Sequence, residues 1–215
     1  NPDTELASAL YSADGILLGS YYRENRSPVS YDELSHNLVN ALVATEDVRF
    51  ENHSGIDPRG MVRVLFKSIL LGQSRSGGGS TLSQQTAKNL FKTRGQASQG
   101  TLSNIPGLRM LIIKTKEWIV ATQLERAYTK NEILTMYLNT SEFGSNAYGI
   151  KTAAKTFFNK EPNELNIQES ATLVGLFKAP SYYSPVYNPD NSLARRNVVL
   201  GQLQKYGYIT ESQLD

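Results

Sequence analysis

Signals for the start of a helix recur along most of the chain, and they constrain its fold more than any other feature. Capping boxes, in which Ser or Thr precedes Glu or Gln by three residues, stand at Ser30/Glu33, Thr81/Gln84 and Thr129/Glu132. Asp57-Pro58 combines an N-cap residue with a proline suited to the first helical position. With the apolar periodicity after them, these signals predict helices over 30–47, 57–72, 81–91, 108–126, 131–139, 148–158, 166–178 and 192–206.

The N-terminal part favours β structure instead. Residues 7–23 combine β-branched and aromatic residues around Asp14-Gly15, a dipeptide typical of hairpin turns. Strands and helices do not alternate after it, which argues against a parallel sheet. The sequence therefore predicts a mainly α fold with a short N-terminal β hairpin, and residues 1–29 are expected to form a β or linker segment.

The composition excludes several kinds of chemistry. The 215 residues include no cysteine and two histidines, His36 and His53, which excludes a thiolate metal site, a cysteine nucleophile and a histidine-rich metal site. The net charge of +2 gives no argument for a nucleic-acid partner, and none is expected. No stretch has the roughly 20 apolar residues that a membrane span needs. The capping box at 210–213 predicts a helix cut short, so we interpret 210–215 as the start of a following segment of a longer protein.

The segment from Glu46 to Gly55 places two adjacent carboxylates, Glu46 and Asp47, at the end of a predicted helix. A carboxylate in such a place can act as a general base. The alternative is a solvated acidic last turn, although this opposes the helix dipole. For His53, which follows in the same segment, a hydrogen-bonded structural role is favoured over a catalytic one, because its neighbours already carry the acid/base potential.

A glycine-rich loop leads into the helix predicted over 81–91. Free N–H groups at a helix N-terminus favour an anion such as phosphate. Thr81, Gln85 and Lys88 share one face of this helix and offer it a hydroxyl, an amide and an ammonium group. The Gly-Lys-Ser/Thr of a Walker loop is absent, so this is not a Walker phosphate loop. The segment either binds a phosphate-bearing substrate or is a linker before a polar surface helix.

Charged residues on the next two predicted helices leave two interpretations open. Glu117 follows Lys114 by three residues, so it is either a salt-bridge partner or the second acid of a site. Spacing alone favours the salt bridge. Lys130 stands close in sequence to Glu125 and Glu132, where charged side chains are usually just solvated.

Together these segments resemble a known family. The chain contains Glu46-Asp-x-x-Phe-x-x-His-x-Gly55, Gly78-Gly-Ser-Thr-x-x-Gln-Gln85, Lys114-x-x-Glu117, Lys130-x-Glu132-Ile-Leu-x-x-Tyr-Leu-Asn139 and Gly175-Leu-x-x-Ala-Pro-Ser-x-Tyr-Ser-Pro185. In this order, and over residues 30–208, they resemble the five signature segments of the peptidoglycan glycosyltransferase family. That family comprises the transglycosylase domains of class A penicillin-binding proteins and the monofunctional transglycosylases.

The resemblance implies a fold and an activity. The fold is lysozyme-like, with a large helical lobe and a smaller membrane-contacting jaw; the glycosyltransferase domain would span 30–209 and the jaw would lie within about 57–80. The activity is polymerisation of lipid II into β-1,4 glycan strands, with a general base, inversion and release of undecaprenyl pyrophosphate. The alternatives are a lysozyme-like glycan hydrolase or lytic transglycosylase, and a wall-binding module without catalysis. A hydrolase does not need to bind pyrophosphate, so the Gly-Gly-Ser-Thr segment with Lys88 favours the transferase.

The resemblance also implies roles for individual residues. Glu46 would be the general base, Asp47 would support it, and Glu117 would be the second carboxylate, near the pyrophosphate and a divalent metal, Mg or Mn. The other residues that it places at the substrate are Phe50, His53, Gly79, Ser80, Thr81, Gln84, Gln85, Lys88, Arg94, Lys114, Lys130 and Asn139.

The partners implied by the resemblance are lipid II, the nascent glycan chain and the membrane surface, with a fused transpeptidase domain and cell-wall synthesis proteins as further candidates. The implied location is the extracytoplasmic face of the bacterial cytoplasmic membrane, with the full-length protein anchored there.

Three positions depart from the family pattern. Ile113 stands where arginine is common, so one cation near the pyrophosphate is missing or is supplied by Arg109 or Lys116. Lys178 replaces a common glutamine and Phe157 a common tyrosine. The last two changes would alter sugar contacts without removing the chemistry.

Residues 61–71 would form the membrane-contacting helix of the jaw. Eight of these eleven residues are apolar, which makes the apolar arc wider than a core-facing stripe requires. We expect Phe66, Ile69 and Leu70 to reach the acyl boundary, and we expect Arg63 and Lys67 to lie among the headgroups. A buried core helix is the alternative.

Overall fold

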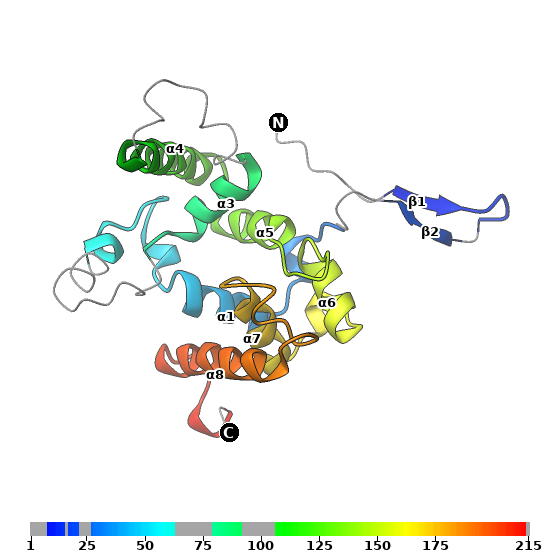
Figure 1. Ribbon diagram of the computed structural model, residues 1–215. Coiled ribbons are helices and arrows are strands. Elements are labelled where there is room, and N and C mark those ends of the chain that lie inside the picture. The colour runs from blue at the N-terminus through cyan, green and yellow to red at the C-terminus, as the bar shows by residue number, and fades with distance from the viewer. Residues whose placement is uncertain (1–7, 16, 22–26, 63–78, 92–105, 214–215) are drawn as a thin grey trace. The chain divides into compact units, whose positions relative to one another are not determined.

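The structure is a computed structural model that describes residues 8–15, 17–21, 27–62, 79–91 and 106–213, and it is mainly helical (Figure 1). The chain forms two compact units. The first comprises Asn1–Thr45 and Leu138–Asp215, and the second comprises Glu46–Tyr137. The mainly α fold predicted from the helix signals is therefore confirmed.

Strands β1 (Ser8–Tyr11) and β2 (Leu17–Tyr21) form an antiparallel pair in the first unit. The turn between them contains Gly15, whose φ of +82° is a conformation that glycine adopts at little steric cost. This turn lies at the Asp14-Gly15 dipeptide.

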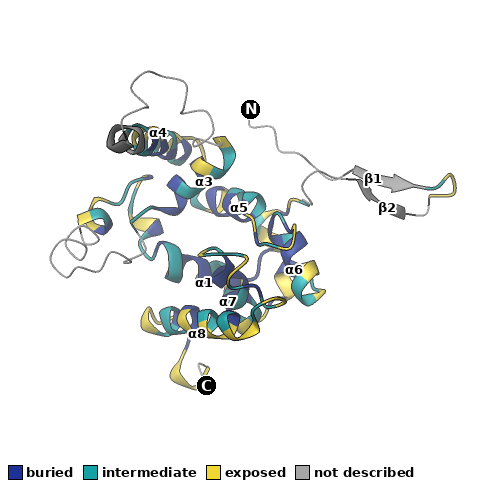
Figure 2. Ribbon diagram, in the orientation of Figure 1, coloured by how far each residue is buried: buried dark blue, intermediate teal, exposed yellow. Residues whose placement is uncertain are grey.

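Three helices form the C-terminal part of the first unit: α6 (Ile150–Phe158), α7 (Ile167–Leu176) and α8 (Pro189–Lys205). Helices α7 and α8 pack against each other, and Figure 2 shows that α8 has a buried and an exposed side. The buried apolar side chains of this pair are Ala171, Leu173, Val174, Leu176, Val199, Leu200 and Leu203. Burial of this face stabilises the unit, because it removes apolar surface from water.

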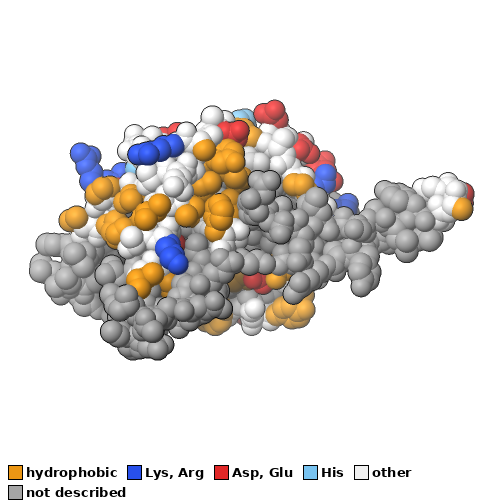
Figure 3. Space-filling model, turned by 90° about the horizontal axis from the view of Figure 1, so that it is seen from above, with side chains coloured by type: hydrophobic (Ala, Val, Ile, Leu, Met, Phe, Trp, Pro, Cys, Tyr) orange, Lys and Arg blue, Asp and Glu red, His pale blue; other side chains and the backbone are white. Residues whose placement is uncertain are grey.

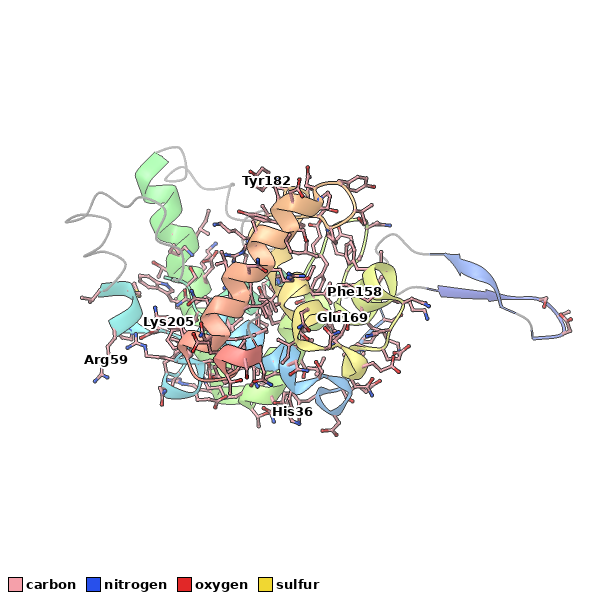
Figure 4. All side chains as sticks on the ribbon, turned by 90° about the horizontal axis from the view of Figure 1, so that it is seen from below. His36, Arg59, Phe158, Glu169, Tyr182 and Lys205 are labelled. Atoms are coloured by element: carbon pink, nitrogen blue, oxygen red, sulfur yellow. The ribbon has the colours of Figure 1, made fainter. Side chains whose placement is uncertain are left out.

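A capping box starts α7 where the sequence predicts it. Asn166 Oδ1 accepts the Glu169 N–H at 2.8 Å, and Glu169 Oε2 accepts the Asn166 N–H at 2.9 Å. Glu169, labelled in Figure 4, also accepts a hydrogen bond from Lys160 at 2.8 Å. The first turn of α7 is thereby tied to the segment that follows α6.

The Ser30/Glu33 capping box does not open the long helix that we predicted. It encloses the 3-10 turn η1 (Tyr31–Glu33), after which Leu34 is extended, with φ −95° and ψ 139°. Helix α1 (His36–Glu46) begins later, because the Ser35 hydroxyl accepts the Leu38 N–H at 3.1 Å and caps it. The predicted end of this helix at Glu46 and Asp47 is confirmed, since α1 ends at Glu46.

Two boundaries near the C-terminus also differ from the predictions. Helix α8 begins at Pro189, three residues before the predicted start, because proline suits the first helical position. The capping box at Thr210 and Gln213 encloses a 3-10 turn, η5 (Glu211–Gln213). A third 3-10 turn of this unit is η4 (Pro162–Glu164).

The second unit contains α3 (Leu82–Phe91), α4 (Pro106–Ala127) and most of α5 (Lys130–Thr140), together with the 3-10 turn η2 (Phe50–Asn52). Helices α3 and α4 pack against each other. Both predicted capping signals are confirmed: the Gln84 N–H donates to Thr81 Oγ1 at 3.2 Å, and the Glu132 N–H to Thr129 Oγ1 at 3.3 Å. Local capping therefore sets where α3 and α5 begin.

Asp57 marks the start of a helical stretch over 58–62, as predicted. The Met61 N–H donates to the Asp57 carbonyl at 3.0 Å, and Arg49 Nε donates to its carboxylate at 3.1 Å. Burial raises the pKa of Asp57, but hydrogen bonds from the Gly60 N–H and Arg49 outweigh it and hold this pKa below its usual value. The rest of the predicted helix, including Phe66 and Leu70, lies outside the described residues.

Of the described helices, none is long and apolar enough to cross a lipid bilayer. The face drawn in Figure 3 carries hydrophobic side chains among charged ones. In the second unit the large exposed ones include Val62, Phe91, Ile119 and Tyr128. Single exposed apolar side chains are normal on folded proteins, so they do not by themselves mark an interface.

Candidate active site

Glu46, the last residue of α1, is half-buried at the start of the second unit. Gln85 on α3 donates from Nε2 to Glu46 Oε2 at 3.1 Å. The other end of the same amide, Gln85 Oε1, accepts the hydroxyl of Tyr137 on α5 at 3.1 Å. Two helices therefore orient this carboxylate, which can accept a proton from a nearby hydroxyl.

Asp47 is buried, and it fastens the segment after α1 to the beginning of α3. Its Oδ2 accepts the Leu82 N–H at 3.0 Å and a hydrogen bond from His53 Nε2 at 2.9 Å. A carboxylate at a helix N-terminus is stabilised by the unpaired N–H groups and the helix dipole. Asp47 therefore positions the adjacent Glu46 against α3.

The side chain of His53 is buried, and its hydrogen bonds define its tautomer. Nδ1 accepts the Gly55 N–H at 3.3 Å, so the proton on Nε2 is the one that is donated to Asp47. The ring lies edge-on to that of Phe50, which is fully buried, with centroids 6.0 Å apart. His53 is therefore hydrogen-bonded at both ring nitrogens, and its structural role stays a prediction.

An ion pair between Glu125 and Lys130, 2.8 Å apart, joins the same cluster. Lys130 Nζ also donates to the His53 carbonyl at 2.7 Å and lies 4.3 Å from the centre of the Phe50 ring. The Ser83 hydroxyl donates to Glu125, whose side chain is only 5% exposed. The prediction of solvated side chains is therefore wrong for Glu125. Its partner follows five residues later, across a break between helices, so helical spacing does not indicate the pair.

The polar side chains at the start of α3 hold the segment around Gly55. Thr81 Oγ1 donates to the Gly55 carbonyl at 2.7 Å, and Gln84 Nε2 donates to the same oxygen at 3.3 Å. Both side chains are buried. In this structure, Thr81 and Gln84 therefore connect the start of α3 to the backbone at Gly55.

Gly55 itself has room for no side chain. Its φ is +92°, and an added Cβ would lie 2.8 Å from the backbone C and O of Ala121. We expect Gly55→Ala to lower the free energy of unfolding by about 2–4 kcal/mol, measured by urea denaturation. Gly201→Ala is the matched control, because a Cβ there meets nothing within 4 Å and the residue lies inside α8. Equal stability of the two variants would contradict the steric argument.

An open cavity of about 190 Å³ lies along α3 and α4, and it is lined by Ser80, Gln84, Gln85, Lys88, Lys114 and Glu117. Lys114 Nζ donates to Glu117 Oε2 at 2.7 Å and to the Ser80 hydroxyl at 3.2 Å. The Glu117 side chain is 2% exposed, and its Oε1 is buried without a hydrogen-bond partner. Two ammonium groups and one carboxylate line this cavity, and their net positive charge favours an anionic ligand.

Residues 14–204 match the transglycosylase family. The chain belongs to this family. It is 40% identical to penicillin-binding protein 1F of Bacillus subtilis and 39% identical to penicillin-binding protein 1A of Escherichia coli. These matches cover 96% and 98% of this chain but 27% and 23% of the relatives, so the chain spans about a quarter of their length.

The fold of this transglycosylase is similar to that of a solved relative, the crystal structure of penicillin-binding protein 1A from Haemophilus influenzae. The TM-score is 0.51 at 26% identity, and the match covers all of this chain and 20% of that one. The family predicted from the five segments is thereby confirmed, and with it the activity at family level, that of a peptidoglycan glycosyltransferase. The hydrolase alternative is not favoured.

The second unit of the transglycosylase contains most of the site residues expected from the sequence. They are Glu46, Asp47, Phe50, His53, Gly79, Ser80, Thr81, Gln84, Gln85, Lys88, Lys114, Glu117 and Lys130. Asn139 belongs to the first unit, where its amide bonds the Val29 N–H at 3.0 Å and the Val29 carbonyl at 2.8 Å. Arg94 lies outside the described residues.

The departure at Ile113 is accommodated in the interior, since this side chain is buried. Lys116 is exposed and does not line the cavity, and the side chain of Arg109 is not among those described. Among the described side chains of α4, Lys114 is therefore the cation at the cavity.

A divalent metal at this site would depend on its substrate for most of its ligands. The described residues contain no group of three or more His, Asp or Glu side chains placed to hold an ion. Glu117 Oε1 is nevertheless a buried carboxylate oxygen without a hydrogen-bond partner. Mg²⁺ commonly binds one or two carboxylates together with substrate phosphates. The residues present fit a metal to which Glu117 contributes one ligand.

Proposed function

We propose that this transglycosylase joins lipid II units into β-1,4-linked glycan strands. The 4-hydroxyl oxygen of the acceptor sugar attacks the anomeric carbon of the donor and forms the new bond. The bond from that carbon to the pyrophosphate oxygen breaks, and undecaprenyl pyrophosphate leaves with the bonding electrons. Because the donor linkage is α and the product linkage is β, one displacement with inversion is sufficient and no covalent glycosyl-enzyme is needed.

The double role of Gln85 carries this proposal, because its side chain bonds Glu46 and also lines the cavity with Lys88 and Lys114. A proton acceptor is thereby linked to two cations through one side chain. This arrangement suits a reaction that removes a proton from one sugar and releases pyrophosphate from another. A glycan hydrolase needs instead a carboxylic acid beside the glycosidic oxygen.

In the proposed mechanism Glu46 takes the proton of the acceptor hydroxyl as the new bond forms. Gln85 holds Oε2, so the proton passes to the other oxygen of the carboxylate. Asp47 keeps the segment in place through its hydrogen bonds to Leu82 and His53.

Negative charge develops on the departing pyrophosphate, and Lys88 and Lys114 would stabilise it in the cavity. Ser80 supports Lys114 by accepting one of its hydrogen bonds. A divalent metal held by Glu117 and the pyrophosphate would supply further positive charge. The ion pair with Lys114 keeps the Glu117 carboxylate in place beside the leaving group.

The setting proposed for this chemistry is a membrane surface. We infer a lysozyme-like arrangement in which a jaw within 57–80 contacts the bilayer from which the lipid-linked donor is taken. The domain would span 30–209 of a longer anchored protein at the extracytoplasmic face, with a transpeptidase domain and cell-wall synthesis proteins as partners.

The direct test incubates the chain with lipid II and Mg²⁺ and resolves the products by size. Polymer is expected, whereas cleavage of a preformed glycan without polymer would favour the hydrolase. We expect Lys114→Met to lower kcat/KM for lipid II by about 10²-fold, because it removes a cation that stabilises the leaving group. Lys155→Met, an exposed lysine on α6, is the control, and thermal melting of both variants accounts for any unfolding. Equal kcat/KM values for the two variants would contradict this role of the cavity.

A further inference from the structure

The side-chain amide of Gln85 is held between Glu46 and Tyr137 in one orientation. Its Nε2 lies 3.1 Å from Glu46 Oε2, and its Oε1 lies 3.1 Å from the Tyr137 hydroxyl. An ionised carboxylate only accepts hydrogen bonds, so the NH₂ group of the amide must face Glu46. The amide oxygen then faces Tyr137, whose hydroxyl donates to it. Turning the amide over would therefore disrupt both hydrogen bonds.

Tyr137 is well placed to impose this orientation, because it is 3% exposed and lies on the apolar side of α5 with Ile133 and Leu134. Side chains packed in a core retain one rotamer and hold their polar atoms in place. The first residue of α5, Lys130, is itself tied to Glu125 and to the His53 carbonyl. The hydroxyl of Tyr137 therefore extends from a helix that is anchored to the same cluster as Asp47.

We propose that Tyr137 is a positioning residue of the transglycosylase, which acts through Gln85 to keep Glu46 in its proton-accepting form. This proposal rests on the proposed role of Glu46 as the general base. With its orientation imposed, Gln85 donates to the carboxylate but offers no acceptor to a protonated Glu46. Hydrogen bonds donated to a carboxylate favour its charged form. The oriented amide therefore stabilises the ionised carboxylate, which is the form that accepts the proton of the acceptor hydroxyl.

The family resemblance implies that Gln85 binds the donor. The role proposed here for Gln85, which is to orient and stabilise the Glu46 carboxylate, is a different one. The charged and titratable groups linked to Glu46 in this unit are Asp47, next in the chain and bonded to His53, and Lys88, Lys114 and Glu117, which share a cavity with Gln85. A change that removes only the Tyr137 hydroxyl leaves all of these groups in place. A shift in the acid limb of the pH–rate profile after this change therefore results from the altered hydrogen bonding of the Gln85 amide.

The test is the pH–rate profile of kcat/KM for lipid II polymerisation by Tyr137→Phe. Without the hydroxyl the amide can turn over and accept a hydrogen bond from protonated Glu46. We expect the acid limb to move to higher pH by about 0.5–1 unit and kcat to fall about 3- to 10-fold. KM for lipid II should stay within about twofold, because the change removes no substrate contact. Tyr182→Phe, at a tyrosine that is 58% exposed in the first unit, should leave the profile unchanged.

A double-mutant cycle separates this role from a structural one. Gln85→Leu alone should move the acid limb at least as far as Tyr137→Phe does, and it serves as the second variant if Tyr137→Phe does not fold. In the Gln85→Leu background, Tyr137→Phe should move the limb no further. Equal losses of activity in both backgrounds with an unmoved limb would overturn the proposal. The proposed function itself would fail differently, through a Glu46→Gln protein that still polymerises lipid II.

Discussion

Replacing Glu46 with glutamine is expected to slow polymerisation of lipid II by a factor of about 10² or more while the protein stays folded. Glutamine has the shape of the native side chain but cannot take the proton of the acceptor hydroxyl. Its amide oxygen can still accept the hydrogen bond that Gln85 donates at 3.1 Å in the native structure. The loss should therefore appear in single-turnover rates and not in the melting temperature.

The matched control is Glu51→Gln, in the 3-10 turn η2 of the same segment. Glu51 is exposed, so its substitution should change neither the rate nor the stability. A Glu46→Gln protein that polymerises at a near-native rate would remove Glu46 from the role of base and would leave the proposed mechanism without a proton acceptor.

The second large effect is expected on stability, at Lys130. Lys130→Met should lower the free energy of unfolding by about 3–5 kcal/mol, because it leaves the buried Glu125 carboxylate without its cation. It also removes the donor to the His53 carbonyl, in the segment that carries Asp47. Urea denaturation without lipid II measures this effect apart from substrate binding.

Lys151→Met is the control for this prediction. Lys151 and Glu161 form an exposed pair at 3.3 Å, with side chains 37% and 51% exposed, so its loss should change stability by no more than about 0.5 kcal/mol. Adding Glu125→Gln to Lys130→Met should recover part of the lost stability, since it removes the unpaired charge. If Lys130→Met instead has native stability but a raised KM for lipid II, Lys130 contacts the substrate directly.

Helix α3 organises the candidate site more than any other element. Its first N–H is bound by Asp47, Gln85 in its second turn bonds Glu46, and Lys88 one turn later lines the cavity. Ser83, on the same helix, donates to Glu125. A change that shifts α3 would therefore disturb the base and the cation-lined cavity together.

The sequence by itself predicted the helical class, the starts of α3, α5 and α7, and the segments that carry the site. These features are local, because an N-cap interaction joins residues three apart and depends little on the rest of the fold. The same argument was wrong at Ser30, where Leu34 is buried in an extended conformation and Ser35 caps α1 instead. There, burial of an apolar side chain decided the backbone conformation against a local signal.

Only the tertiary structure decided the partners of the charged and polar side chains. Gln85 meets Glu46 across 39 residues of sequence and Tyr137 across 52, and the pairing depends on how residues 46–137 pack within the second unit. Glu125 likewise is buried and bonded to Lys130 and Ser83, although its place among charged residues near a helix end suggested a solvated side chain. The sequence contains the chemical groups and their local order. Which of them share a buried hydrogen bond is decided by packing, because burial makes an unpartnered polar group costly and so selects the arrangement in which partners meet.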